Sequence, residues 1–189
     1  MSYVERRRFL WVVFLAGLLV LALSAALTNG TTLVRLRFQD LAQRATAIAR
    51  LRCVGSESRW EQGELWTETR FEVMEMHKGS LSRLVTVRTI GGHDGHLRSH
   101  VDGVPAFQSG EQVYLFLWGR AGEPYRVLGW TQGTFRIARD RATGVESVTQ
   151  DSAAAAVFDP ETRSFRRGGI RNVPVAVFQI KLRKALEDP

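Results

Sequence analysis

Three histidines lie close together in a glycine-rich stretch, and their side chains are the ones best suited to metal chemistry. His93, His96 and His100 are interleaved with Asp94 and Asp102. Imidazole and carboxylate groups can hold a zinc or copper ion when a loop folds around it. The spacing matches no recognised ligand pattern, and the surrounding glycines disfavour the helix that would align His93 with His96. We therefore interpret the stretch as an exposed polar loop and assign no metal, while a metal-dependent enzyme or metal carrier using these histidines stays an alternative.

The other polar residues do not form a catalytic arrangement. Ser109 lacks the flanking glycines of a nucleophile elbow. Three carboxylates share one predicted strand with an arginine: Glu68, Glu72, Glu75 and Arg70. This mixture is typical of a solvated strand face and not of an acid/base pair. The glycines beside the histidines lack the lysine and the strand-to-helix setting of a phosphate loop: Gly91, Gly92 and Gly95. We assign no catalytic residue and no cofactor, and we prefer a non-catalytic role.

Tryptophans offer a second type of candidate site, an aromatic binding surface. Four tryptophans could contribute to it: Trp60, Trp66, Trp118 and Trp130. Most are expected to be core or rim residues. Trp66 differs because it falls on the charged face of the central predicted strand, so it is the tryptophan to test for ligand contact.

The central predicted strand is the stretch from Leu65 to Gly79. Apolar residues and threonines fall on one face as far as Val73, and charged residues and Trp66 fall on the other. Such a strand exceeds the usual length, so it must bend within a small domain. The apolar positions change parity at Met74, which predicts a bulge near Met74 or Glu75.

The remaining pattern predicts further elements around this strand. We expect an amphipathic helix at 38–49 and a long irregular segment at 91–112. Other strands are expected at 48–56, 84–90, 113–118, 125–130, 135–139 and 145–148. Residues 151–172 are interpreted as a flexible connection to a final helix with Pro174 in its first turn. We expect this helix to pack on the domain, and its alternative position is on a membrane surface. Short, regularly spaced strands without alternating helices favour an antiparallel barrel or sandwich in a mainly β chain.

The first residues differ from the rest of the chain. A charged start, Arg6 to Arg8, precedes an uncharged apolar run from Phe9 to Leu27, which is long enough to cross a bilayer as a helix. The positive-inside rule predicts that the arginines stay in the cytoplasm and that the chain after residue 27 lies outside it. Residues 1–30 are therefore a cleaved signal peptide, with small residues near Ala26, or a signal-anchor helix. The predicted location is the cell envelope: anchored in the inner membrane, or secreted or periplasmic after cleavage.

The length of the rest of the chain suits one domain that can bury its own hydrophobic core. The 189-residue chain carries a formal charge of +7, and the charge falls to +5 without residues 1–27. This modest basic excess indicates attraction to anionic lipid headgroups or envelope polymers, or has no specific meaning, which is the interpretation we prefer. Cys53 is the only cysteine, so no internal disulfide can form. Its apolar neighbours predict a small buried side chain.

Several short motifs resemble an uncharacterised family of exported bacterial proteins. They are Thr32 to Arg35, Asp40-Leu41, Lys78-Gly79, Gly91-Gly92, the run Gly103, Pro105, Phe107, Gly110, Glu111, then Tyr114 to Leu117 and Gln132-Gly133 before Phe135. The order of elements is also remotely similar to netrin-like modules and tissue inhibitors of metalloproteases. This resemblance implies a small antiparallel OB-like β-barrel with a binding role. Those inhibitors reach the protease zinc through a disulfide-tethered amino-terminal cysteine, which a chain with Cys53 alone cannot copy.

The combined expectation is a mainly β chain in three parts. A hydrophobic membrane segment at 1–30 precedes an OB-like barrel with one N-terminal helix at 31–150, and 151–189 hold the connection and the C-terminal helix. The predicted function is a non-catalytic binding module, membrane-tethered through residues 9–27, that contacts a protein or an envelope polymer. A single-strand nucleic-acid binder is the remaining alternative. Export argues against it, so no nucleic acid is expected as a partner.

Overall fold

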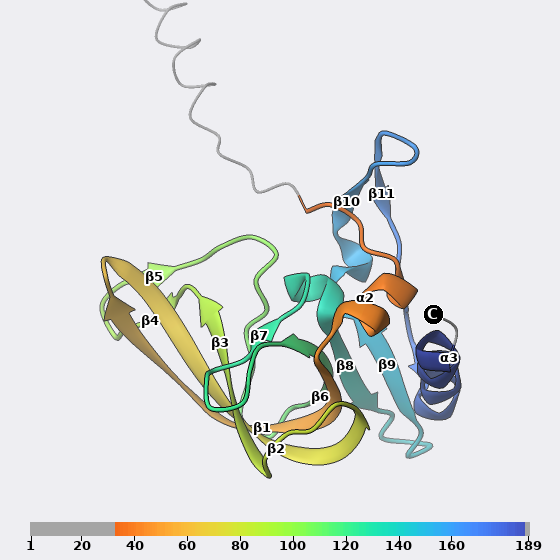
Figure 1. The fold of residues 1–189 in the computed structure, drawn as a ribbon, viewed down its shortest axis with the longest axis horizontal. Helices are drawn as coiled ribbons and strands as arrows, with labels where there is room; N and C mark the ends of the chain where they lie inside the picture. Colours follow the sequence, from red (N-terminus) through yellow and green to blue (C-terminus); the bar gives the residue numbers. More distant parts are fainter. Residues whose placement is uncertain (1–32, 188–189) are drawn as a thin grey trace, which may run out of the picture. The chain divides into compact units, whose positions relative to one another are not determined.

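The computed structural model describes residues 33–187 (Figure 1). The predicted signal peptide or anchor, residues 1–30, lies outside the described residues. Within the described part, no helix is both long and apolar enough to span a bilayer. The described residues form a mainly β structure with an antiparallel sheet and two α-helices, as the sequence predicts.

The helices are few and short. The two α-helices are α2 (Phe38–Arg44) and α3 (Val175–Glu187), and the 3₁₀ helices are η1 (Trp130–Gly133) and η2 (Asp151–Ala154). Strands in the first half are β1 (Ala47–Glu61), β2 (Glu64–Lys78), β3 (Leu84–Ile90), β4 (Gly92–His93), β5 (Arg98–Ser99) and β6 (Gln112–Trp118). The later strands are β7 (Arg126–Val127), β8 (Thr134–Arg139), β9 (Glu146–Gln150), β10 (Ala156–Asp159), β11 (Ser164–Arg167) and β12 (Val173–Pro174).

One main sheet carries most of these strands, in the order β12-β9-β8-β6-β1-β2-β3, with β7 paired to β6. Two hairpins, β4–β5 and β10–β11, stand apart from it. Figure 1 shows β1 and β2 as long curved ribbons, with β4–β5 near one end and β8, β9 and the helices near the other.

The long strand β2 bends as the sequence predicts. In its antiparallel pairing with β1, Glu75 lies opposite Arg50 and Val73 lies opposite Leu51, so Met74 is an extra residue. The predicted bulge at Met74 or Glu75 is therefore confirmed. An extra residue increases the local twist of a strand. The bend lets β1 pair with β2 over its whole length and with β6 near its start.

The segment around Tyr125 lies between β3 and β6. The Tyr125 amide donates to the Thr86 carbonyl at 2.8 Å, and the Arg88 amide donates to the Tyr125 carbonyl at 2.8 Å. This is a parallel bridge, centred on Val87. The adjoining β7 pairs antiparallel with the end of β6. The chain at 125–127 thus connects two strands that are distant in the sheet order.

Strand β6 is buried on both faces, which explains its continuous apolar sequence. Val113, Leu115 and Leu117 belong to a first core, inside the curve of β1, β2 and β3. Tyr114 and Phe116 belong to a second core on the opposite face. The prediction of a buried strand here is confirmed, and β6 is the layer shared by both cores.

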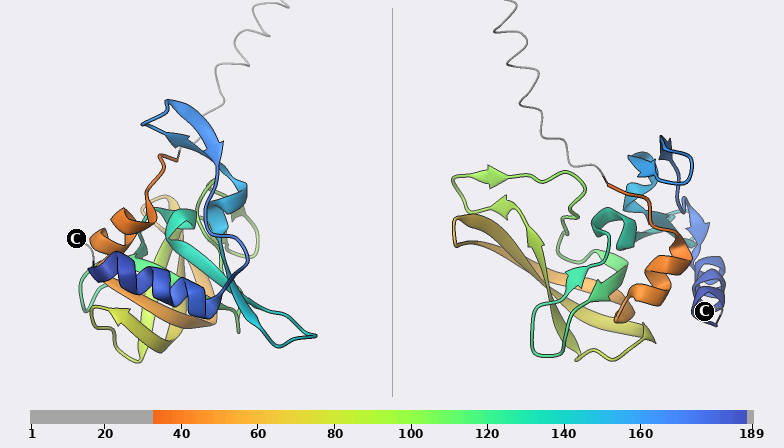
Figure 2. Two further views of the ribbon diagram at one scale, coloured as in Figure 1. Left: turned by 90° about the vertical axis from the view of Figure 1, so that its right-hand side faces the viewer. Right: turned by 45° about the horizontal axis from the view of Figure 1, so that its top comes forward.

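The second core is covered by the two helices, which lie side by side (Figure 2). Leu41 and Ala42 of α2 and Phe178 and Leu182 of α3 are buried against β6, β8 and β9. Burial of these side chains confirms that the final helix packs on the domain, and it supplies most of the free energy that holds both helices in place.

Several element boundaries differ from the predictions. Helix α2 ends at Arg44 because Ile48 and Ala49 enter β1, where they pair with Phe116 and Leu115. The predicted strand at 125–130 is shortened because Gly129 adopts a left-handed conformation, with φ 65°, before η1.

The segment predicted as a connection, residues 151–172, contains η2 and the hairpin β10–β11. Pro174, expected in the first turn of the final helix, lies in β12 opposite Ser147. The helix begins one residue later.

Candidate functional site

The structure places the three histidines on or beside the exposed hairpin β4–β5. His93 is in β4, His96 is in the turn, and His100 follows β5, and all three side chains are exposed. His100 Nε2 lies 3.3 Å from Asp102 Oδ1 on the surface. Within residues 33–187, no three His, Cys, Asp or Glu side chains come together as a metal-binding group.

The Asp94 carboxylate stabilises this hairpin and connects it to the β1–β2 hairpin. Its carboxylate accepts hydrogen bonds from the amides of Leu97 at 2.7 Å and His96 at 2.8 Å, and from Trp60 Nε1 at 2.6 Å. The Leu97 amide and then the Trp60 indole hold the pKa of Asp94 well below its ordinary value, because both favour the ionised carboxylate. Trp60 lies near the tip of the β1–β2 hairpin, so Asp94 joins the two tips.

Beneath this hairpin and the following loop lies a cavity of about 440 Å³. Strands β1, β2 and β3 supply its floor, and residues 91–93 and 98–108 supply its rim and cover. The lining carries six hydroxyl side chains: Ser56, Ser58, Thr67, Thr69, Thr89 and Ser99. Thr69 is 1% exposed and Thr89 is 9% exposed, so part of this polar lining lies deep in the sheet.

Hydroxyl pairs cross from β1 to β2 on the cavity floor. Ser56 and Thr69 lie 2.8 Å apart, and so do Ser58 and Thr67. The Thr67 hydroxyl donates to the Gly91 carbonyl at 2.6 Å, while the His93 amide donates to Ser58 Oγ at 3.2 Å. The second pair therefore fixes the start of β4 to the strands below it.

Arg136 fixes the other end of the loop. Its guanidinium makes two hydrogen bonds to the Asp151 carboxylate, at 2.6 and 2.8 Å, an ion pair with Glu111, and a hydrogen bond to the Ala106 carbonyl at 2.8 Å. Burial alone would lower the pKa of Arg136, but the two carboxylates outweigh it and raise the pKa. Phe107 packs against Arg136 and against the buried Phe71 ring. Both ends of the loop are thus held by specific contacts, and the cavity is preformed.

Trp66 lies on the opposite, outer face of the sheet. The Arg88 guanidinium is 4.5 Å from the Trp66 ring centroid and that of Arg126 is 5.3 Å away. Arg126 also lies 5.9 Å from the Trp118 ring. Cation–π contacts therefore already occupy Trp66, and Trp118 is the more exposed of the two indoles, at 47%.

The carboxylates of β2 are engaged by basic or amide side chains. Glu68 pairs with Arg59 at 2.6 Å, and Glu72 pairs with Arg52 and Arg83. Glu75 accepts hydrogen bonds from Gln179. These contacts belong to the outer strand face and bring no two of the carboxylates together around a common substrate position.

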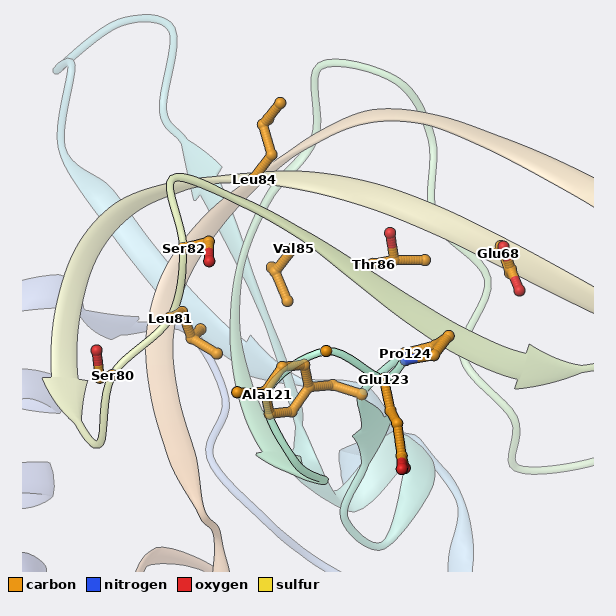
Figure 3. A pocket seen from close by; sticks show the side chains of 12 residues that line it. Glu68, Ser80, Leu81, Ser82, Leu84, Val85, Thr86, Ala121, Glu123 and Pro124 are labelled. Carbon is orange, nitrogen blue, oxygen red and sulfur yellow. The ribbon is translucent and has the colours of Figure 1, made fainter.

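A second pocket, of about 570 Å³, lies between the start of β3 and the loop before β7 (Figure 3). Leu81 and Val85 flank it, and the carboxylates of Glu68 and Glu123 lie toward one side. Its lining contains no histidine, cysteine or basic side chain, so neither Ser80 nor Ser82 has a histidine or lysine beside it in this pocket.

Two further residues have structural contacts, and for Cys53 this is the role that the sequence predicts. Cys53 is 2% exposed, and burial raises the pKa of its thiol, as expected for an unreactive buried cysteine. Ser109 donates its hydroxyl hydrogen to the Val54 carbonyl at 3.0 Å and so anchors the loop to β1.

Sequence reasoning missed the cavity floor. A signal was present, because Ser56 and Ser58, like Thr67 and Thr69, recur at two-residue spacing on the face that carries Phe71 inward. Hydroxyl residues at positions where apolar ones are expected indicate a polar cavity in place of core. No family model, curated protein or solved structure matches the chain.

Proposed function

We propose that the chain is an exported, membrane-tethered and non-catalytic binding module, built on a small OB-like barrel, which contacts a protein or an envelope polymer. Export and tethering rest on the sequence of residues 1–27. The contact is made through the cavity beneath the loop 91–112 and the hairpin tips beside it.

The strand order supports the barrel part of this proposal. Strand β1 pairs with β2 and β6, β2 pairs with β3, and β6 pairs with β7. Two hydrogen bonds between Tyr125 and β3 bring the segment before β7 beside that strand. Five segments around one core resemble the partly open Greek-key barrel of OB folds. The relation to netrin-like modules belongs to the same proposal.

The preformed cavity is the observation that carries the proposed binding role. Ligand sites are typically concave, largely preformed and about 300–1,000 Å³ in volume. The cavity under the loop has a volume in this range. The loop is held at one end by the hydrogen bond from the His93 amide to Ser58, and at the other end by Arg136. Loops fixed on a rigid scaffold are also where binding residues commonly lie.

Site-directed photo-crosslinking in the native envelope tests the proposal. A photo-reactive amino acid at Leu97, which is 60% exposed on the hairpin, should give a discrete crosslinked partner. Ile180, which is 64% exposed on α3, is the matched control and should give little or none. Equal labelling from both positions, or labelling from Ile180 alone, would show that the loop is not the contact surface.

A further inference from the structure

We propose that the cavity beneath the loop 91–112 binds one acidic sugar residue of an envelope polysaccharide. This inference rests on the proposed function, since it names the ligand class of the same site. It follows from two properties of the lining: its hydroxyl groups and the sign of its charge.

The hydroxyl groups of the lining retain hydrogen-bonding capacity. The O–H donors of Ser58 and Thr67 are both used, because Ser58 donates to Thr67 and Thr67 donates to the Gly91 carbonyl. In the Ser56–Thr69 pair one hydroxyl donates to the other, and Ser56 also contacts the Cys53 sulfur, so this pair retains acceptor positions. Thr89 lines the cavity at 9% exposure, and its hydroxyl has no hydrogen-bond partner among the described residues.

The Thr89 hydroxyl is open to the cavity, where water or a ligand can form a hydrogen bond with it. Hydroxyl groups both donate and accept, so they match a ligand whose own groups are hydroxyls. A sugar ring presents such groups around its edge and C–H groups on its faces, which suit the apolar side chains of Val104 and Phe107 on the cavity wall.

The charge of the lining selects an acidic sugar. No Asp, Glu or Lys side chain lines the cavity, whereas Arg98, His93 and His100 lie at its rim. Arg98 makes no ion pair among residues 33–187. An unpaired guanidinium beside a neutral polar cavity favours a ligand with a carboxylate, which it can bind with two hydrogen bonds.

A peptide fits the same cavity less well. Peptides usually bind as an added strand at a sheet edge, where they form hydrogen bonds with unpaired backbone groups. The cavity lies over one face of β1, β2 and β3, and the serine and threonine side chains of that face line its floor. Its polar lining is therefore made mainly of side-chain hydroxyls and not of a strand edge.

Calorimetric titration of the full chain tests the proposal, in lauryldimethylamine oxide, a detergent without a sugar headgroup. The probes are tetragalacturonate and the neutral maltotetraose. We expect tetragalacturonate to bind at least tenfold more tightly, and Arg98→Gln to remove most of that difference. Thr89→Val should weaken tetragalacturonate binding about 3- to 10-fold, the effect of one hydrogen bond.

Matched controls are available on the same elements. Thr86→Val lies on the other face of β3 and should leave affinity unchanged, as should Arg120→Gln on an exposed loop. Circular dichroism melts show whether the Thr89→Val variant stays folded. If that variant unfolds, Arg98→Gln still tests the proposal, because Arg98 is at an exposed position.

The outcomes separate this inference from the proposed function. Failure of both oligosaccharides to bind, equal affinity for both, or equal losses in the control variants would overturn the saccharide assignment. If a crosslinker at Leu97 then still captures a discrete partner, the binding module stands with a different ligand. If it captures none, both proposals fail together.

Discussion

At the scale of single residues, His77 is a half-buried histidine with no hydrogen bond to its Nε2 atom among the described residues. Its Nε2 atom is buried and unpartnered among the described residues, near the Tyr114 ring and 3.7 Å from the nearest Glu75 oxygen. Burial lowers the pKa of His77, and the nearby Glu75 carboxylate offsets this only in part. The folded protein therefore favours the neutral imidazole.

This histidine predicts a loss of stability in mild acid. Because the pKa is lower in the folded state than its unfolded value of 6.5, the unfolded chain binds the proton first as pH falls. The free energy of unfolding should drop below about pH 6.5 until the folded pKa is reached. Urea denaturation at pH 7.5 and 5.5 should show a smaller drop for His77→Gln than for the wild type. The exposed His96→Gln is the control, and an unchanged pH dependence in His77→Gln would contradict the assignment.

Arg136 is the residue whose loss should most disturb the loop. Arg136→Met leaves the Asp151 and Glu111 carboxylates without their partner, and a half-buried charge left unpaired costs about 2 kcal/mol. Asp151→Asn added to Arg136→Met should recover part of this loss. The free energy of unfolding from urea titrations measures both effects. Arg141→Met, in an exposed turn, serves as the control. A loss no larger than the control's would show that the cluster is not stabilising.

At the scale of elements, α3 is part of the second core. Phe178 is fully buried, and its ring lies 4.8 Å from Tyr114 and 5.2 Å from Phe135 between centroids. Phe178→Ala should lower the free energy of unfolding by about 3–5 kcal/mol, through lost burial and the cavity left behind. Val177→Ala, at a position 52% exposed on the same helix, should change it by less than about 1 kcal/mol. Similar effects in the two variants would mean that the helix is not docked as described.

The elements predicted best from the sequence are those whose pattern is local. The alternation and parity change of β2 identify both the strand and its bulge, and the apolar run of β6 identifies a strand buried on both faces. The hairpin β10–β11 pairs locally but carries a weaker pattern. Strand β12 pairs with a more distant part of the chain, with Val173 opposite Val148, and no local pattern reports this pairing.

The candidate site was only partly predictable for the same reason. The loop 91–112 stands out by its glycines and histidines, and it does form the rim and cover of the cavity. The hydroxyls of its floor come from three strands, and Ser56, Thr69 and Thr89 meet only when β1, β2 and β3 pair in register. Long-range register, which sequence alone leaves open, therefore decides which polar side chains share the cavity.

At the scale of the whole molecule, the two cores lie on opposite faces of β6 and differ in their relation to the cavity. The second core, with α2, α3 and the Phe135 ring, stabilises one side of β6 and contributes no lining to the cavity. The first core supports the floor of the cavity through Cys53, Phe71 and Val87. The cavity proposed to bind a ligand therefore lies beside the first core and not the second.

The location of the whole domain is open to a direct test. Arg6 to Arg8 precede the apolar run 9–27, so the positive-inside rule predicts that residues 33–187 lie outside the inner membrane. Protease added to intact spheroplasts should then digest the domain, while a cytoplasmic marker survives. Intact mass should match the uncleaved chain if residues 9–27 are an anchor, and a chain starting near residue 27 if they are a signal peptide. Replacing Arg6 to Arg8 by glutamate should reduce the digested fraction, because the charge bias is reversed. Digestion only after the spheroplasts are lysed would place the domain in the cytoplasm and remove the basis for an envelope ligand.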